Sequence, residues 1–154
     1  MDAKLINPFV DAFTTVIPML GFPEPKRTKL YAASSRVRSL GVSMLVGFTK
    51  QIRGNVVYNM SEDTAKFIAS QMMMGMSVNV FDEMAQSAIS ELSNMLTAHT
   101  ATNITSLGLD VDISTPSLTV GKDFDVKISD GQYLVVEMSL NDQLVDLAIA
   151  VDQN

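Results

Sequence analysis

Residues 82–108, DEMAQSAISELSNMLTAHTATNITSLG, are the segment from which the fold of this chain is most readily inferred. It begins at Asp82, a residue type that caps helix starts, and it ends at Gly108, a residue type that stops helices. Between them small and apolar side chains recur at helical spacing, which predicts a helix from Asp82 to about Ser106. This is the longest helix that the sequence predicts.

One stripe of this helix carries a carboxylate and a carboxamide. The stripe consists of Ser87, Glu91, Asn94 and Ala98. Residues three or four apart are neighbours on a helix surface, so Glu91 and Asn94 lie side by side with a small residue at each end. Such a flat face could press against a site on another macromolecule. Without further context, a solvated helix face is the commoner explanation of these polar residues.

The rest of the chain predicts two shorter helices and several strands. Gly and Pro follow the first helical pattern, and turn residues separate the strands of the second half. The expected elements are a helix at 5–20, a connector with one extended segment at 22–36, a hairpin at 42–60, a helix from Ser61 to about Gly75, and strands at 111–120, 124–128, 133–140 and 144–151.

The same order of apolar positions occurs twice, which predicts an internal duplication within a single domain of residues 1–154. A shift of 76 residues superimposes the apolar helix positions Ala12, Phe13, Val16, Met19 and Leu20 on Ala88, Ile89, Leu92, Met95 and Leu96. A shift of 90 residues superimposes the strand positions Gly41, Met44, Val46, Phe48 and Val57 on Gly131, Leu134, Val136, Met138 and Leu147. Chance agreement of amphipathic patterns is the alternative. Duplication is favoured because helices and strands agree in the same order, giving pseudo-repeats of roughly 1–75 and 76–154.

The polar stripe itself does not repeat. Under the helix shift, Ser87 corresponds to Asp11, Glu91 to Thr15 and Asn94 to Pro18. The buried face is kept while the carboxylate and carboxamide pair is lost. We therefore expect one site per chain, on the second half.

Composition narrows the class of protein. The chain has 154 residues, 47% of them hydrophobic, which fits one globular domain with a real core. A net charge of −6 without a Lys/Arg cluster makes nucleic acid and anionic membranes poor partners. No cysteine is present, so disulfides and thiol chemistry are excluded. We expect a cytoplasmic protein without its own metal site, because His99 has no second His or Cys at ligand spacing.

The residues of the stripe and their surroundings resemble the CheC/CheX/FliY family of chemotaxis phosphatases. The resemblance rests on Ser87-x-x-x-Glu91-x-x-Asn94 followed by Pro116 at the start of a strand, and it extends over nearly the whole chain. Methionines 72–74 and 76 around Gly75, and Gly54 before a strand, also look like that family. A single surviving site is similar to the CheX branch, whereas the CheC branch keeps two.

This resemblance implies a phosphatase that hydrolyses the aspartyl-phosphate of a CheY-like response regulator. Asn94 would orient the attacking water, Glu91 would pair with the partner's active-site lysine, and Ser87 and Ala98 would contact the partner. Magnesium would belong to the partner's site. The implied fold is α+β and CheC-like, with about six mostly antiparallel strands and two matched long helices on one face. A homodimer is also implied.

Two alternatives remain open at this level. Relatives in the flagellar switch, such as the middle domain of FliM, are structural, so the chain could bind a response regulator without hydrolysing its phosphate. A scaffold needs neither Glu91 nor Asn94, which argues against this alternative. The regulator could also belong to a pathway outside chemotaxis.

Overall fold

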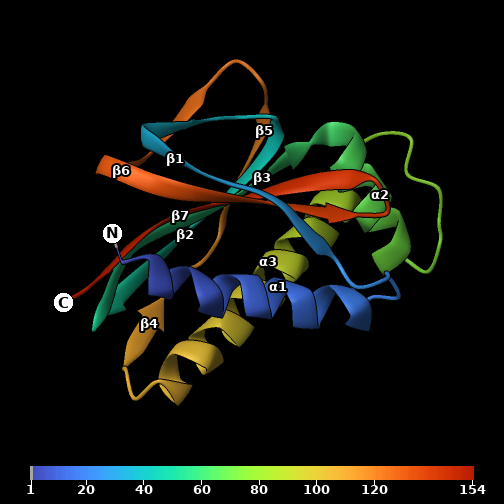
Figure 1. The fold of residues 1–154 in the computed structure, drawn as a ribbon. Coiled ribbons are helices and arrows are strands. Elements are labelled where there is room, and N and C mark those ends of the chain that lie inside the picture. Colours follow the sequence, from blue (N-terminus) through green and yellow to red (C-terminus); the bar gives the residue numbers. More distant parts are fainter. Residues whose placement is uncertain (1) are drawn as a thin grey trace.

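The computed structural model describes residues 2–154. Its helices are the 3-10 helix η1 (Ala3–Ile6) and the α-helices α1 (Asn7–Met19), α2 (Glu62–Met72) and α3 (Glu83–Ser106). Its strands are β1 (Lys26–Arg38), β2 (Gly41–Lys50), β3 (Ile52–Ser61), β4 (Val111–Ile113), β5 (Ser117–Gly121), β6 (Asp125–Leu140) and β7 (Gln143–Gln153) (Figure 1). Within residues 2–154, no helix combines the length and apolar character that crossing a membrane requires.

The strands form one seven-stranded sheet with the order β1-β6-β7-β3-β2-β4, and β5 also pairs with β2. Each pair of strands is antiparallel. The prediction of an α+β protein with a largely antiparallel sheet is therefore confirmed. The sheet has one strand more than the six expected. One predicted strand is two strands and two predicted strands are one, so the additional strand is β1, which lies mostly in the predicted connector.

The main core lies between the sheet and the helices. Helices α1 and α3 pack against each other on the same side of the sheet (Figure 1). Phe9 of α1 meets Phe48 of β2 edge to face, with ring centroids 5.3 Å apart. Apolar side chains from all three helices and from the central strands join this cluster. Burial of this apolar surface is the main source of stability for the fold.

Strand β1 replaces the connector that the sequence predicted at residues 22–36. Most of its side chains are exposed, so the strand shows no alternation of apolar and polar residues. Its order comes from pairing with β6, with Leu30 opposite Val136 and Ala33 opposite Tyr133. This pairing joins segments about a hundred residues apart, and local sequence cannot reveal it.

The predicted strand at 111–120 is in fact two short strands, β4 and β5, and Pro116 lies just before β5. The break is held by Ser114, whose backbone N–H donates to the Gly47 carbonyl at 2.9 Å. The Ser114 hydroxyl oxygen accepts a second bond from the Gly47 N–H at 2.8 Å. Both short strands pair with β2.

The predicted strands at 124–128 and 133–140 are one long strand, β6. The Ser-Asp-Gly segment was expected to turn the chain. Instead, Ser129 bonds locally to Gly131, and the chain continues in the same strand. The partner strand β1 shifts register between Ser34 and Arg36, which accommodates this irregularity.

The strand positions that the 90-residue shift pairs share a buried face in β2 and β6, but the pair Val57 and Leu147 in β3 and β7 does not. Val46 and Val136 both belong to the main core. Val57, however, lies in a smaller cluster on the opposite face of the sheet, whereas Leu147 lies in the main core. Since side chains alternate between faces, Val56 is the residue that shares the face of Leu147.

Gly54 is required where β3 runs beside β7. Its φ of +141° is unfavourable for other residues, and a Cβ there would collide with the carbonyl oxygen of Ala150. The glycine thus lets two central strands approach each other.

Candidate active site

The start of α3 is fixed by three local contacts. The Asp82 side chain accepts a hydrogen bond from the Ala85 N–H at 3.0 Å, as a helix cap does. Phe81 is buried in the main core. The Gln86 side chain donates to the Phe81 carbonyl at 3.0 Å. These contacts set the rotation of the helix and thereby the direction in which its exposed stripe points.

All four residues of the predicted stripe, Ser87, Glu91, Asn94 and Ala98, are exposed on α3. The opposite side of the helix is buried against α1 and the sheet; its residues are Ala85, Ile89, Leu92, Ser93, Leu96, Thr97, Thr100 and Ile104. The helix runs unbroken for 24 residues, so the stripe lies in its middle. The structure therefore brings the four residues onto one open face.

The Glu91 and Asn94 side chains take part in no hydrogen bond or ion pair within residues 2–154. The backbone beneath them is firmly held. The buried hydroxyl of Thr97 donates to the Ser93 carbonyl at 2.5 Å and approaches the Asn94 carbonyl at 3.4 Å. A rigid backbone thus presents a carboxylate and an amide whose hydrogen-bonding groups are available to a partner.

The corresponding face of α1 is also exposed, but it lacks this chemistry. Asp11, Thr15 and Pro18 occupy the equivalent positions. Pro18 lies in the last turn of α1, which ends at Met19. These three positions of α1 therefore lack the adjacent carboxylate and carboxamide of α3, and α1 ends one residue after the position equivalent to Asn94.

Among residues 2–154, no group of three or more His, Cys, Asp or Glu side chains could hold a metal ion. His99 is half-buried on α3. The chemistry that these residues can supply is hydrogen bonding and a single negative charge.

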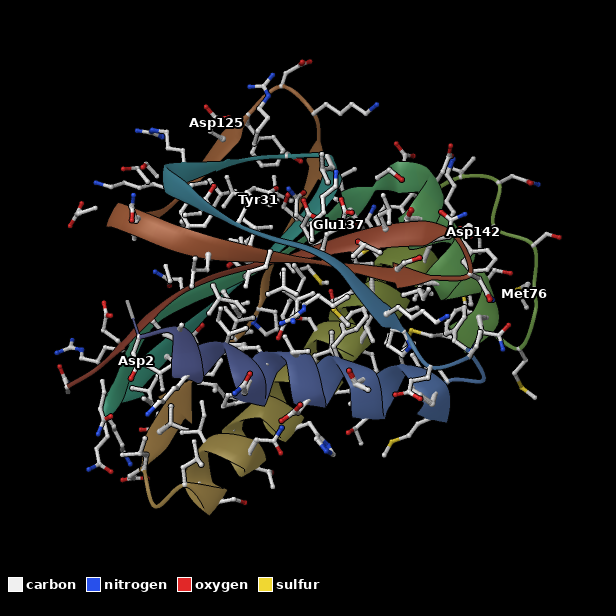
Figure 2. All side chains as sticks on the ribbon, in the orientation of Figure 1. Asp2, Tyr31, Met76, Asp125, Glu137 and Asp142 are labelled. Carbon is white, nitrogen blue, oxygen red and sulfur yellow. The ribbon has the colours of Figure 1, made fainter. Side chains whose placement is uncertain are left out.

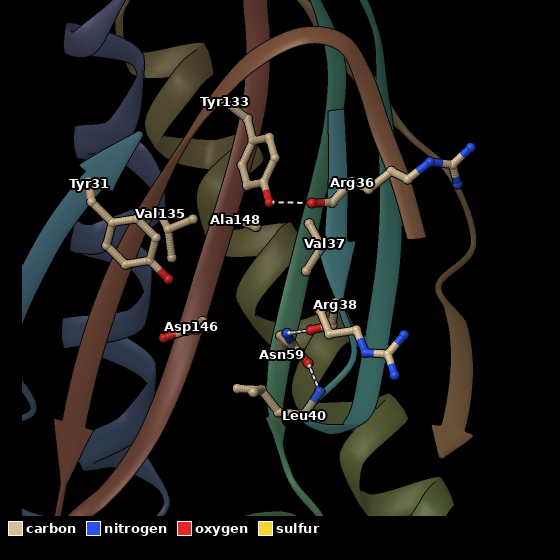
Figure 3. A pocket seen from close by; sticks show the side chains of 10 residues that line it. All are labelled: Tyr31, Arg36, Val37, Arg38, Leu40, Asn59, Tyr133, Val135, Asp146 and Ala148. Atoms are coloured by element: carbon tan, nitrogen blue, oxygen red, sulfur yellow. Dashed lines mark hydrogen bonds between the residues drawn. The ribbon is translucent and has the colours of Figure 1, made fainter. Parts of the chain in front are cut away.

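The other face of the sheet has a hollow of about 280 Å³, which the sequence did not predict (Figure 3). Tyr31, Tyr133 and Asp146 line it, and the Tyr133 hydroxyl donates to the Arg36 carbonyl at 2.6 Å. Tyr31 lies on the side of the sheet away from α1 (Figure 2). The hollow is therefore separated from the stripe on α3 by the sheet.

Asp146 is the one carboxylate in this hollow, and its environment favours the neutral form. Burial, reinforced by the negative charge of Glu137, raises the pKa of Asp146 to about 6, while Lys29 acts in the opposite sense. Glu137 and Asp146 face each other across β6 and β7. The Asn141-Asp142 turn could have revealed this pairing, since both residues have the positive φ of a tight hairpin.

Comparison with known proteins places the chain in a family. Residues 42–139 match the family model described as chemotaxis phosphatase CheX. The chain is 35% identical over 153 residues to the CheY-P phosphatase CheX of Thermotoga maritima, covering 98% of this chain and 97% of that protein.

Solved structures share the fold over nearly the whole chain. A CheC-like superfamily protein from Shewanella sp. PV-4 has a TM-score of 0.86 at 25% identity, covering 99% of both chains. The CheX in a CheX–CheY complex with BeF3 and Mg2+ from Borrelia burgdorferi has a TM-score of 0.81 at 25% identity, covering 96% of this chain and 97% of that chain. With the family match and the full-length relative, this chain belongs to the CheX family of chemotaxis phosphatases.

Proposed function

We propose that this chain hydrolyses the aspartyl-phosphate of a CheY-like response regulator, using the stripe on α3. The observation that supports this most is the exposed pair Glu91 and Asn94 in a chain that matches a CheY-P phosphatase over nearly its full length. The stripe projects from a rigid helix rather than lining a pocket of its own. A reacting group held by another protein can therefore be approached directly.

In this proposal Asn94 places the attacking water. An acyl phosphate is already reactive, so catalysis requires chiefly an aligned nucleophile and control of charge. An amide both donates and accepts hydrogen bonds and does not titrate, so it can orient a water molecule at any physiological pH. The exposure of Asn94 supports this role, because its side-chain amide is open to a water molecule and to the partner.

Glu91 fixes the docking of the partner. Its carboxylate is exposed and one helical turn from Asn94, so it can pair with a lysine at the edge of the regulator's active site by a charge-assisted hydrogen bond. Ser87 and Ala98 are small, which lets the helix approach closely at both ends of the pair. The magnesium ion of the reaction belongs to the regulator's site in this proposal. We also propose that the chain acts in the cytoplasm.

We also propose that the fold arose by duplication, with α1 and α3 as the matched long helices. The order of the sheet supports this: exchanging β1, β2 and β3 with β5, β6 and β7 leaves the order of these six strands unchanged apart from its direction.

We also propose that the chain forms a homodimer. Exposed Leu30 and Tyr31 on the edge strand β1 support it, and elution at monomer size across a dilution series would contradict it.

The test of the proposed function is release of phosphate from the organism's own phosphorylated regulators. Asn94→Ala should lower the turnover rate at saturating regulator on the order of 100-fold or more, because the attacking water loses its alignment. Thr15→Ala is the matched control, since it truncates an exposed polar side chain of α1, at the position equivalent to Glu91. Circular dichroism should be unchanged in both variants.

Unchanged turnover in Asn94→Ala would exclude the role given to this amide. No phosphate release by the wild-type chain, together with tight binding of the phosphorylated regulator, would instead favour the scaffold alternative. Binding and hydrolysis are therefore measured on the same samples.

A further inference from the structure

Two large apolar side chains are exposed at the N-terminal end of the stripe. Val80 is 70% exposed and Met84 is 61% exposed. Met84 precedes Ser87 by three residues and Glu91 by seven, so all three lie on one face of α3. At 1.5 Å per residue, Met84 lies about 15 Å from Asn94 along the helix. Met84 therefore continues the stripe in one direction, and Val80 lies in the loop four residues before Met84.

The backbone around this pair is anchored. Phe81, between them, is buried in the main core, and the Asp82 N–H donates to the Val80 carbonyl at 2.8 Å. The cap at Asp82 and the bond from Gln86 to the Phe81 carbonyl hold the same turn. Val80 and Met84 are thus exposed on a fixed backbone. Because this backbone is already ordered, binding of a partner there costs little backbone conformational entropy.

The equivalent end of α1 is different. The 76-residue shift places Met84 on Pro8, which is buried, and Val80 on Lys4, which is charged and exposed. Helix η1 precedes α1 there and contributes Leu5 and Ile6 to the core. The exposed apolar end is therefore present only beside Glu91 and Asn94, as expected if it serves the same partner.

We propose that Val80 and Met84 are a docking patch for an apolar surface of the response regulator that borders its phosphorylation site. This inference rests on the proposed function. The stripe offers one charge, one amide and small side chains, which give orientation but little burial. A few well-buried side chains carry most of the binding energy at protein interfaces, and methionine is among the residue types enriched there. Methionine suits such a contact because its flexible side chain adapts to the surface it meets.

The test is the double variant Val80→Ser with Met84→Gln, compared with the wild type. Two quantities are measured: the Michaelis constants for the phosphorylated regulator, and binding to the same regulator loaded with beryllofluoride and Mg2+. KM and Kd should each rise about tenfold or more, since two apolar side chains no longer become buried. The kcat should stay within about twofold, because the patch does not reach the reacting atoms.

Leu107→Gln is the matched control. Leu107 is also 61% exposed and caps the other end of α3, so it tests whether any loss of exposed apolar surface weakens binding. Unchanged KM and Kd in the double variant, or an equal change in the control, would overturn the docking patch. If the wild type binds the regulator through this patch but releases no phosphate, the proposed hydrolysis fails while the docking patch stands.

Discussion

Helices α1 and α3 have matching buried faces and different exposed faces. Phe13 and Ile89, equivalent under the helix shift, are both buried in the main core. On the exposed side, α3 carries Glu91 and Asn94 where α1 carries Thr15 and Pro18. Burial constrains one face of each helix in size and polarity, whereas the exposed face is free to differ. In the proposed function, the acting residues therefore lie on a surface that the stability of the fold leaves free to vary.

The largest expected effect concerns the buried faces of α1 and α3, which both pack into the main core. Phe13→Ala and Ile89→Ala should each destabilise the fold by about 3 kcal/mol, because each removes a fully packed side chain from one core. Urea unfolding measures the change. Thr15→Ala, on the exposed face of α1, should stay within about 0.5 kcal/mol. A small effect of either core substitution would show that the two helices do not support the fold equally.

The second-largest expected effect concerns the exposed face of α3, where Glu91 has no equivalent carboxylate on α1. Glu91→Gln should raise KM for the phosphorylated regulator about tenfold with little change in kcat, because a charge-assisted contact with the partner is lost. Asp11→Asn removes one exposed carboxylate from the matched face of α1. It should leave both constants unchanged. Equal effects of the two substitutions would mean that only the net charge of the chain matters.

The smallest expected effect concerns Asp146, which lines the hollow on the face of the sheet away from α3. The raised pKa of Asp146, about 6, means that the fold favours its neutral form. The stabilising contribution of the neutral Asp146 carboxyl is complete below about pH 4 and is lost as the pH rises through about 6. Asp146→Asn stays neutral, so it should be more stable than the wild type by about 1 kcal/mol at about pH 7.5, after allowance for solvent screening.

This difference should vanish at about pH 4, where the wild-type carboxyl is neutral too. Urea unfolding at the two pH values measures it. Asp142→Asn, at the exposed hairpin turn beside it, is the control. A stabilisation of Asp146→Asn that is the same at both pH values would show that ionisation is not the cause.

Helix positions were predicted well because their signals are local. The long helix was expected from Asp82 to about Ser106 and runs from Glu83 to Ser106 with Asp82 as its cap. Strand β1 was missed, since its exposed residues are ordered by pairing with distant β6. The hollow around Asp146 was missed for the same reason, because it forms where segments from both halves of the chain meet.

Local sequence is enough to place Ser87, Glu91, Asn94 and Ala98 on one helical stripe and to show that the first helix has no matching pair, because helix period and side-chain identity are local properties. Three-dimensional packing is needed to show that this stripe is open while the other side of α3 is buried, and that Met84 and the loop residue Val80 are exposed at its N-terminal end. Exposure depends on what packs against an element. In this chain α1 and the central strands cover α3 on one side.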